Sequence, residues 1–219
     1  GDIDLYVDYT GTMFASLLNY TPTNDADFVY NIVKRDMKSK YNIETLAPFN
    51  FNNTYVIAIR EDTRRKYNIN NISDMRTASS DLRFCGTLEF MNRADGIIGL
   101  TNIYSLSFKD YVAIDDAPRY IALDSKEVDV ITAFSTDGLL KKFYLITLED
   151  DKKFFPPYYA VPFIRGETLN KYPQIAEILE RLGNLLDEET MIELNYQVDE
   201  LQKDPKEVVR EFLTNNKLN

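Results

Sequence analysis

Thr54-Tyr55-Val56-Ile57-Ala58-Ile59-Arg60 is the stretch of sequence that decides the fold. Its unbroken apolar centre is too short for an ordinary helix, and it predicts a strand in a sheet that is covered on both faces. Similar runs at residues 82–86, 128–134 and 160–165 predict further strands, and 143–148 is another apolar run. Helix patterns alternate with these strands, so we expect the α/β class with a largely parallel sheet.

Capping residues mark where several of the intervening helices begin. Aspartate precedes three amphipathic stretches, and a proline at the first helical position strengthens the last of them. Ser73-Asp74 also reads as a cap for a short turn. The opening residues 2–9 alternate apolar and acidic side chains, as a half-buried strand does. The predicted helices are 26–40 after Asp25, 62–67, 117–123, 174–182 after Pro173, 188–194 after Asp187, and 205–213 after Asp204-Pro205.

The composition excludes several classes of enzyme and binding protein. The chain has 219 residues, a formal net charge of −10, no His and one Cys. Without His there is no Ser-His-Asp triad and no imidazole metal ligand, and one Cys provides neither a disulfide nor a thiolate zinc site. The acidic balance argues against nucleic acid as a partner. Cys85 lies in an apolar context and is expected to be a buried hydrophobe.

Aromatic residues stand at the ends of the predicted strands. Tyr9 ends the first strand, Tyr55 begins the second, Phe134 ends the strand 128–134, and Tyr158 follows a Pro-Pro corner. Ligands of open α/β sheets bind at strand ends, and several ring faces meeting there would attract a quaternary ammonium ion. The alternative is that these rings only pack in the core, and the sequence pattern leaves both interpretations open.

Six motifs occur in one order along the whole chain and carry a family resemblance. Together they closely resemble the OpuC/OpuB-type substrate-binding proteins of ABC importers, which bind glycine betaine, carnitine, choline and related quaternary amines. The motifs are Tyr9-Thr10-Gly11-Thr12, Phe51-Asn52-Asn53-Thr54-Tyr55, Leu88-Glu89-Phe90-Met91-Asn92-Arg93-Ala94-Asp95-Gly96, Ser135-Thr136-Asp137-Gly138, Phe154-Phe155-Pro156-Pro157-Tyr158-Tyr159-Ala160 and Leu194-Asn195-Tyr196-Gln197-Val198-Asp199.

The resemblance implies a two-lobed periplasmic-binding-protein fold of the second type, with the ligand between the lobes. Lobe one would take residues 1–52 and 156–219, and lobe two residues 53–155. Family members carry further residues before the segment equivalent to Gly1, which form the first strand, first helix and second strand of lobe one. The resemblance therefore implies that lobe one is incomplete here and that the chain is a piece of a longer protein.

The resemblance also implies a set of ligand-binding residues and no cofactor. The aromatic cage maps to Tyr9, Tyr55, Phe134 and Tyr158, and relatives carry Tyr at the position of Phe134. Asp137 is expected to brace the turn after Phe134 rather than to touch the ligand. Residues expected at the non-ammonium end of the ligand are Thr12, Asn53 and Arg119.

The partners implied are a small quaternary ammonium ligand and a membrane permease. The protein would be extracytoplasmic, at the bacterial cell surface or in the periplasm, and held by a lipid anchor or by fusion to the permease. Residues 86–90 and Arg119-Tyr120 also resemble the ergothioneine importers of the same family, and ergothioneine carries a trimethylammonium group. Two further alternatives stay open: an enzyme on the same fold, and a chain whose incomplete lobe one does not close on ligand.

Overall fold

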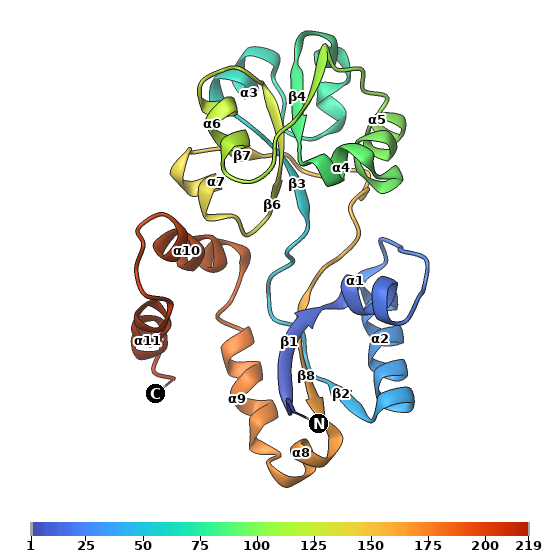
Figure 1. Cartoon of the computed structure of the whole chain (residues 1–219), viewed down its shortest axis with the longest axis vertical. Coiled ribbons are helices and arrows are strands. Elements are labelled where there is room, and N and C mark those ends of the chain that lie inside the picture. The colour runs from blue at the N-terminus through green and yellow to red at the C-terminus, as the bar shows by residue number, and fades with distance from the viewer. Residues whose placement is uncertain (1, 219) are drawn as a thin grey trace. The chain divides into compact units, whose positions relative to one another are not determined.

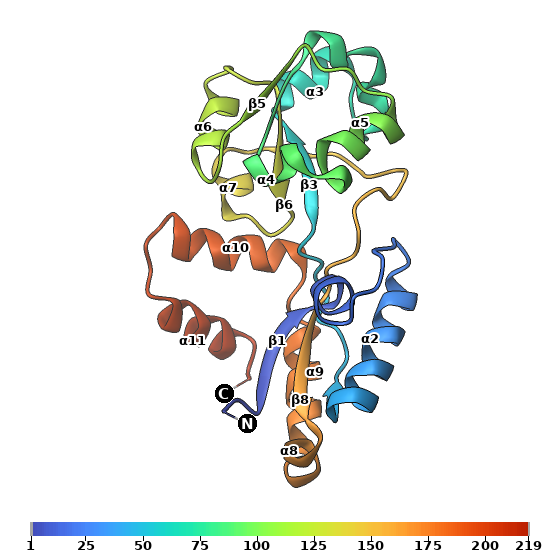
Figure 2. The same ribbon diagram turned by 45° about the vertical axis from the view of Figure 1, so that its right-hand side comes forward.

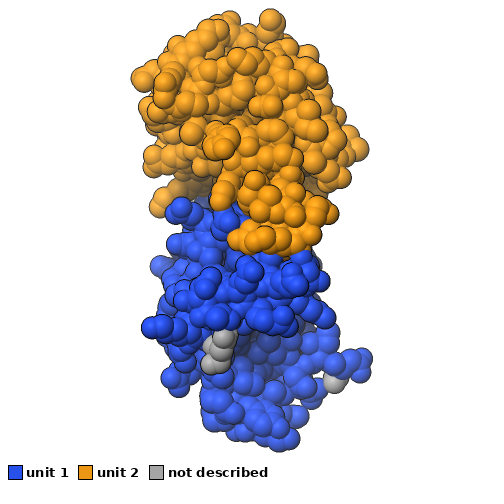
Figure 3. All heavy atoms as spheres, turned by 90° about the vertical axis from the view of Figure 1, so that its left-hand side faces the viewer, with its two compact units in different colours: residues 1–54, 156–194, 204–219 blue, residues 55–155, 195–203 orange. Residues whose placement is uncertain are grey.

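The computed structural model describes residues 2–218, and within them the chain divides into two compact units. Unit 1 comprises residues 1–54, 156–194 and 204–219, and unit 2 comprises 55–155 and 195–203 (Figures 1 and 3). Both units combine helices with a sheet, so the α/β class expected from the sequence is confirmed. No helix within residues 2–218 is long and apolar enough to span a membrane.

Unit 1 contains a three-stranded sheet in the order β1-β8-β2, with both pairings antiparallel. β1 pairs with only one neighbour and is an edge strand, on which Val7 is 45% exposed. The elements are β1 (Leu5–Tyr9), α1 (Thr10–Thr12), η1 (Met13–Leu17), α2 (Ala26–Tyr41), β2 (Ile43–Thr45), β8 (Ala160–Arg165), α8 (Gly166–Lys171), α9 (Gln174–Gly183), the first part of α10 (Glu188–Asp199) and α11 (Pro205–Asn215).

Alternate residues of β8 build two separate cores in unit 1, because successive side chains of a strand point to opposite faces. On one face Val161 and Phe163 pack with Val33 and Met37 of α2. On the other face Ala160 joins a cluster to which α9, α10 and α11 contribute. Figure 2 shows α2 and β8 side by side, as the first cluster requires.

Unit 2 contains a five-stranded sheet in the order β5-β4-β6-β3-β7. Helices α5 and α6 lie on opposite sides of this sheet in both ribbon views (Figures 1 and 2). The elements are β3 (Tyr55–Ile59), α3 (Glu61–Tyr67), η2 (Ser73–Thr77), η3 (Ser79–Asp81), β4 (Arg83–Gly86), α4 (Leu88–Asn92), η4 (Ala94–Ile98), α5 (Gly99–Tyr104), β5 (Asp110–Ala113), α6 (Pro118–Asp124), β6 (Val130–Phe134), α7 (Gly138–Lys142), β7 (Ile146–Thr147) and the last part of α10.

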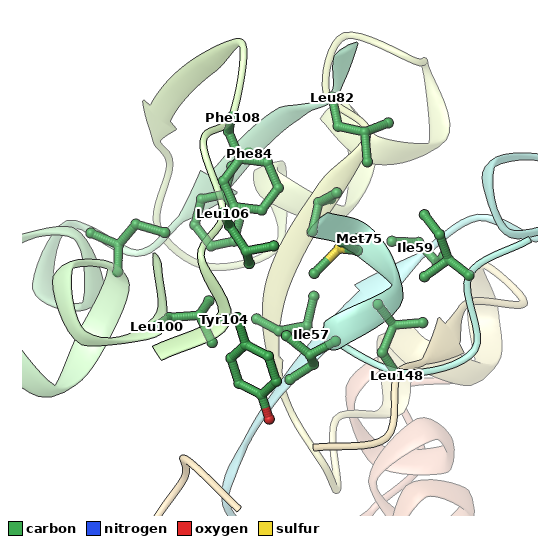
Figure 4. Close-up of a cluster of buried hydrophobic side chains, with 14 of the residues drawn as sticks. Ile57, Ile59, Met75, Leu82, Phe84, Leu100, Tyr104, Leu106, Phe108 and Leu148 are labelled. Atoms are coloured by element: carbon green, nitrogen blue, oxygen red, sulfur yellow. The ribbon is translucent and has the colours of Figure 1, made fainter. Parts of the chain in front are cut away.

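The main core of unit 2 lies against one face of the sheet. Ile57 and Ile59 of β3 pack there with Phe84 of β4 and with Tyr104 at the end of α5 (Figure 4). These side chains are at most 1% exposed. Each buried aliphatic or aromatic side chain contributes about 1.5–3 kcal/mol by leaving water. The cluster therefore favours the folded state of unit 2.

The expectation of a largely parallel sheet is wrong. In unit 2 only β5, β4 and β6 are parallel, because β3 runs antiparallel to β6 and β7 runs antiparallel to β3. In unit 1 both pairings are antiparallel. β3 and β8 follow the passages of the chain between units at residues 54–55 and 155–156, and each runs antiparallel to both of its neighbours. Apolar runs predict the strands but contain no information about this direction.

The predicted helix caps are confirmed where the side chain precedes a long helix. Asp25 accepts a hydrogen bond from the N–H group of Phe28, and Asp204 accepts from the N–H groups of Lys206 and Glu207. The cap expected at Ser73-Asp74 is wrong: the Asp74 carboxylate instead accepts from the N–H groups of residues 70 and 71, before the turn.

Candidate functional site

In unit 1, Tyr9 and Asn53 meet through a hydrogen bond between their side chains. The Asn53 amide donates to the Tyr9 hydroxyl oxygen at 3.0 Å, although the two residues are 44 positions apart. The Tyr9 side chain packs on the cluster around Phe49 and Phe51. This arrangement holds a half-buried ring at the end of β1, where the sequence predicted an aromatic ligand contact.

Gly11 allows the Tyr158 ring to lie against the turn that follows β1. A Cβ atom at Gly11 would stand 2.8 Å from two Tyr158 ring carbons and 2.7 Å from the Pro157 carbonyl oxygen. Real Cβ contacts are not that short, so a residue with a side chain cannot occupy position 11 unless the ring moves. The glycine therefore serves this close approach and not a special backbone angle, because no described glycine has a positive φ.

Backbone hydrogen bonds join the segments that carry these rings. The N–H group of Tyr158 donates to the Asn52 side-chain oxygen at 2.7 Å, and the N–H group of Asn53 donates to the Tyr158 carbonyl at 3.0 Å. The Thr10 hydroxyl accepts from the N–H group of Tyr159 at 3.1 Å. Tyr9, Asn53 and Tyr158 are half-buried, and they form what we call the unit 1 cluster. Thr12 is also half-buried and follows Gly11 in the turn after β1.

In unit 2, Tyr55 and Phe134 are cross-strand neighbours on β3 and β6. Their rings stack with centroids 4.7 Å apart and planes inclined by 29°. Phe90 lies 5.0 Å from the Tyr55 ring and Phe155 lies 6.2 Å from it, between ring centroids. Tyr55, Phe90, Phe134 and Phe155 form what we call the unit 2 cluster, in which Tyr55 and Phe134 are half-buried and the other two are buried.

Arg119 lies inside unit 2, where its guanidinium group binds protein atoms. Its Nε donates to the Thr132 carbonyl at 2.8 Å and its Nη1 donates to the Asp116 carbonyl at 3.1 Å. Nη2 stands 3.6 Å from the Asp137 carboxylate, and the residue is only 4% exposed. The family resemblance implied that Arg119 contacts the ligand. In the structure its guanidinium group instead binds β6 and the turn that follows β6.

The described residues offer little that catalysis would use. Cys85 is fully buried, and burial raises the pKa of its thiol, which disfavours the reactive thiolate. Among residues 2–218 no group of three or more His, Cys, Asp or Glu side chains is arranged to hold a metal ion. What the two clusters offer chemically is ring faces, hydroxyls and one amide, which suit non-covalent recognition.

Sequence reasoning missed the residues that hold the rings in place. Gly11, Asn52 and Thr10 lie inside the quoted motifs, but their roles depend on contacts with residues more than one hundred positions away. Phe90 and Phe155 also lie in quoted motifs, and their packing on Tyr55 was not foreseen. The sequence offered one signal: Phe155 lies in the same motif as the predicted cage residue Tyr158, and Phe90 lies in another of the six motifs.

Comparison with solved structures defines the class of protein. A crystal structure described as a glycine betaine/carnitine/choline ABC transporter aligns with 100% of this chain and 80% of its own, with a TM-score of 0.95 and 30% identity. The apo structure of YehZ from Escherichia coli aligns over the whole chain with a TM-score of 0.87 and 26% identity. The fold is that of the periplasmic substrate-binding proteins.

The family follows from the sequence comparison. Residues 1–215 match the model of the substrate-binding domain of ABC-type glycine betaine transport systems, and the chain belongs to this family. The resemblance recognised from the motifs is therefore confirmed. The family consists of transport binding proteins and not of enzymes, so the enzyme alternative falls away.

Two curated relatives illustrate the range of names within the family. The ergothioneine transport permease/ergothioneine binding protein EgtU of Helicobacter pylori (strain G27) is 37% identical over 97% of this chain, which spans 38% of that protein. The carnitine transport binding protein OpuCC of Listeria monocytogenes is 34% identical over 99% of this chain, which spans 71% of that protein. The chain thus spans well under half of the first relative and about seven tenths of the second.

Proposed function

We propose that the chain is the extracytoplasmic solute-binding domain of an ABC importer and that it captures a quaternary ammonium compound. The observation that carries the proposal is the pair of aromatic clusters at the predicted positions, within a chain of this family. In the proposal, Tyr9 and Tyr158 of unit 1 and Tyr55 and Phe134 of unit 2 contact the same trimethylammonium group.

The energetics of ring faces suit this kind of ligand. A quaternary ammonium ion has no N–H group to donate, so it gains little from carbonyls or carboxylates compared with a primary amine. Each desolvated ring contact contributes roughly 0.5–2 kcal/mol. Four rings supply several kcal/mol of the about 8 kcal/mol that micromolar affinity requires, and the remainder comes from the apolar surface that the methyl groups bury.

The polar end of the ligand is assigned to unit 1. Asn53 lies in the unit 1 cluster and Thr12 lies in the turn after β1; they offer an amide and a hydroxyl, which suit a carboxylate or hydroxyl on the ligand. Arg119 is left out of this set, because its guanidinium group already binds Thr132, Asp116 and Asp137. In the proposal it acts on the site only through the strand that it holds.

The choice among choline, glycine betaine, carnitine and ergothioneine is a second question. The 37% identity to a Helicobacter protein named for ergothioneine favours that solute as the alternative ligand, and the OpuCC relative favours carnitine. All four solutes carry three methyl groups on nitrogen, so the same cage serves each of them. We further propose a membrane permease as the partner, reached through a lipid anchor or by fusion of the two chains.

A thermal-shift titration of the 219-residue chain tests the proposal. A ligand that binds only the folded state raises the melting temperature, by a free energy of about 2.7 kcal/mol at one hundred times its dissociation constant. We expect at least one of the four solutes to stabilise the chain at millimolar concentration. No stabilisation by any of them, in a chain that melts cooperatively, would contradict the proposal for this chain.

A further inference from the structure

The backbone of Phe134 is held on both sides by one residue, Asp137. The Phe134 N–H group donates to the Asp137 carboxylate at 2.9 Å, and the Phe134 carbonyl accepts from the Asp137 N–H group at 3.0 Å. Phe134 is the last residue of β6, and hydrogen bonds at the end of a strand open more easily than those at its centre. The side chain and the main chain of Asp137 together close this end.

Two buried side chains of α6 hold the Asp137 carboxylate in turn. The Tyr120 hydroxyl donates to the same carboxylate oxygen that accepts from Phe134. The Arg119 guanidinium group stands 3.6 Å from that oxygen and also donates to the carbonyl of Thr132, two residues before Phe134. Tyr120 is 1% exposed and Arg119 is 4% exposed, so both are fixed by packing.

The Tyr120 hydroxyl keeps its proton in this buried group. Burial, followed by the nearby Asp137 carboxylate, raises the pKa of the Tyr120 hydroxyl far above its usual value, so this hydroxyl remains a donor at every physiological pH. Arg119 is always charged, and its charge is matched by Asp137. Hydrogen bonds to a charged acceptor are about twice as strong as neutral ones, so the carboxylate is a rigid centre for the turn.

We propose that Asp137, Tyr120 and Arg119 are positioning residues that hold the Phe134 ring in the orientation from which it contacts a quaternary ammonium ligand. The inference rests on the proposed function for its ligand, but the geometry that carries it lies wholly within unit 2. The Phe134 ring stacks on Tyr55 at 4.7 Å, so a turn of the Phe134 backbone shifts both rings of the unit 2 cluster.

The first test needs no ligand. Tyr120→Phe removes the hydroxyl and keeps the ring, and Tyr30→Phe in unit 1 is the control. The Tyr30 ring is also packed against a core, and its hydroxyl donates to the Leu46 carbonyl at 3.0 Å, away from the unit 2 cluster. We expect the Phe134 amide to exchange its hydrogen about tenfold faster in Tyr120→Phe than in the wild type. The exchange rate of the Ile131 amide, on the same strand, should change less. An equal change at both amides, or none, would overturn the inference.

The second test compares the affinities of the chain for a charged ligand and for an uncharged ligand of the same shape. Choline and its uncharged isostere 3,3-dimethyl-1-butanol have the same shape, so the ratio of their affinities reports what the positive charge contributes to binding, and a change of this ratio between variants reports a change in the surroundings of that charge. We expect Tyr120→Phe and Asp137→Asn to reduce this ratio about threefold or more, and Tyr30→Phe to leave it unchanged while also lowering the melting temperature. A loss of stability without a change in the ratio would assign the three residues a purely structural role.

The two tests separate the inference from the proposed function. If the wild-type chain binds none of the four solutes, the proposed function fails, and the exchange measurement still decides whether Tyr120 and Asp137 hold Phe134. If the wild type binds choline and the ratio is the same in Tyr120→Phe and Asp137→Asn, the positioning role fails and the proposed function stands.

Discussion

Tyr55 and Phe134 stand opposite each other on β3 and β6, and their ring centroids lie 4.7 Å apart. Carbon atoms in contact are about 3.5–4.0 Å apart, so no group fits between rings this close. A cation must therefore meet the outer face or the edge of the stacked pair. The pair therefore acts as one aromatic wall in the site that we propose, and that proposal takes its other two rings, Tyr9 and Tyr158, from the unit 1 cluster.

The first prediction concerns the ring of Tyr55. Tyr55→Ala removes the ring and exposes Phe134, so we expect the affinity for quaternary amines to fall by about 1–2 kcal/mol, roughly fivefold to thirtyfold. Tyr55→Phe keeps the ring face and should cost less than about threefold. Isothermal titration calorimetry with both variants checks this. Equal losses in the two variants would show that the hydroxyl, and not the ring face, makes the contact.

The second prediction concerns the close approach at Gly11. Gly11→Ala places a Cβ atom 2.8 Å from the Tyr158 ring, so the ring or the turn must shift. Overpacking of this kind costs about 1–3 kcal/mol, and we expect both a lower melting temperature and weaker ligand binding. The double variant Gly11→Ala, Tyr158→Ala relieves the contact with the ring but keeps the 2.7 Å approach to the Pro157 carbonyl oxygen. Gly11→Ala should therefore lower the melting temperature less in a Tyr158→Ala background than in the wild type, while binding stays weak in both. An equal loss in the two backgrounds would refute the contact with the ring.

The third prediction concerns Asp36, whose carboxylate accepts hydrogen bonds from Arg35, Lys40 and Tyr20 at 2.7–2.9 Å. The side-chain hydrogen bond from Arg35, followed by that from Lys40, lowers the pKa of this carboxyl well below its usual range. Because the pKa is lowered by folding, the stabilisation is present above the unfolded value of about 3.9 and is lost as the pH falls through the folded value.

Asp36→Asn should therefore destabilise unit 1 at pH 7, and the difference from the wild type should shrink as the pH falls below about 4. Urea unfolding curves of both proteins between pH 2 and pH 7 check this. The exposed Glu180, for which no bound partner is described, offers the control Glu180→Gln. A difference between the wild type and Asp36→Asn that does not depend on pH would contradict the assignment.

The fourth prediction concerns the edge of the unit 1 sheet. Within residues 2–218, β1 pairs with β8 alone, and an exposed apolar edge strand promotes association between copies of the 219-residue chain. Val7→Lys places a charge on this edge, so we expect less self-association by light scattering at high protein concentration. Val209 of α11 is exposed to a similar extent, 51% against 45%, and Val209→Lys is the matched control. An equal decrease of self-association in the two variants would show that it depends on net charge and not on the edge of β1.

Local signals in the sequence predicted the elements of both units well. The runs 54–60 and 160–165 became β3 and β8, and the caps at Asp25 and Asp204 begin the long helices α2 and α11. These features depend on neighbours in the sequence. The short strand β2 was not predicted, because three residues carry too little pattern. The direction of β3 was also mispredicted, since it depends on the path of the chain between units.

Some features of the candidate site were also predicted from the sequence, and others depend on packing between distant segments. Tyr9, Tyr55, Phe134 and Tyr158 were placed at strand ends from the sequence, and the structure has each of them half-buried at such an end or beside one. Arg119 shows where this reasoning stops. The family resemblance implied a ligand contact at Arg119, but its burial and its bond to Thr132 follow from how α6 packs on β6. No local pattern reports that packing.

The most direct test of the central claim is a calorimetric titration of the wild-type chain with choline, glycine betaine, carnitine and ergothioneine, alongside the uncharged isostere 3,3-dimethyl-1-butanol. The account predicts that at least one quaternary amine binds with micromolar to submillimolar affinity, and that the isostere binds at least about tenfold more weakly than choline if choline binds. Heat of binding from none of the four amines, or equal affinities for choline and its isostere, would contradict capture of a quaternary ammonium ion by aromatic rings.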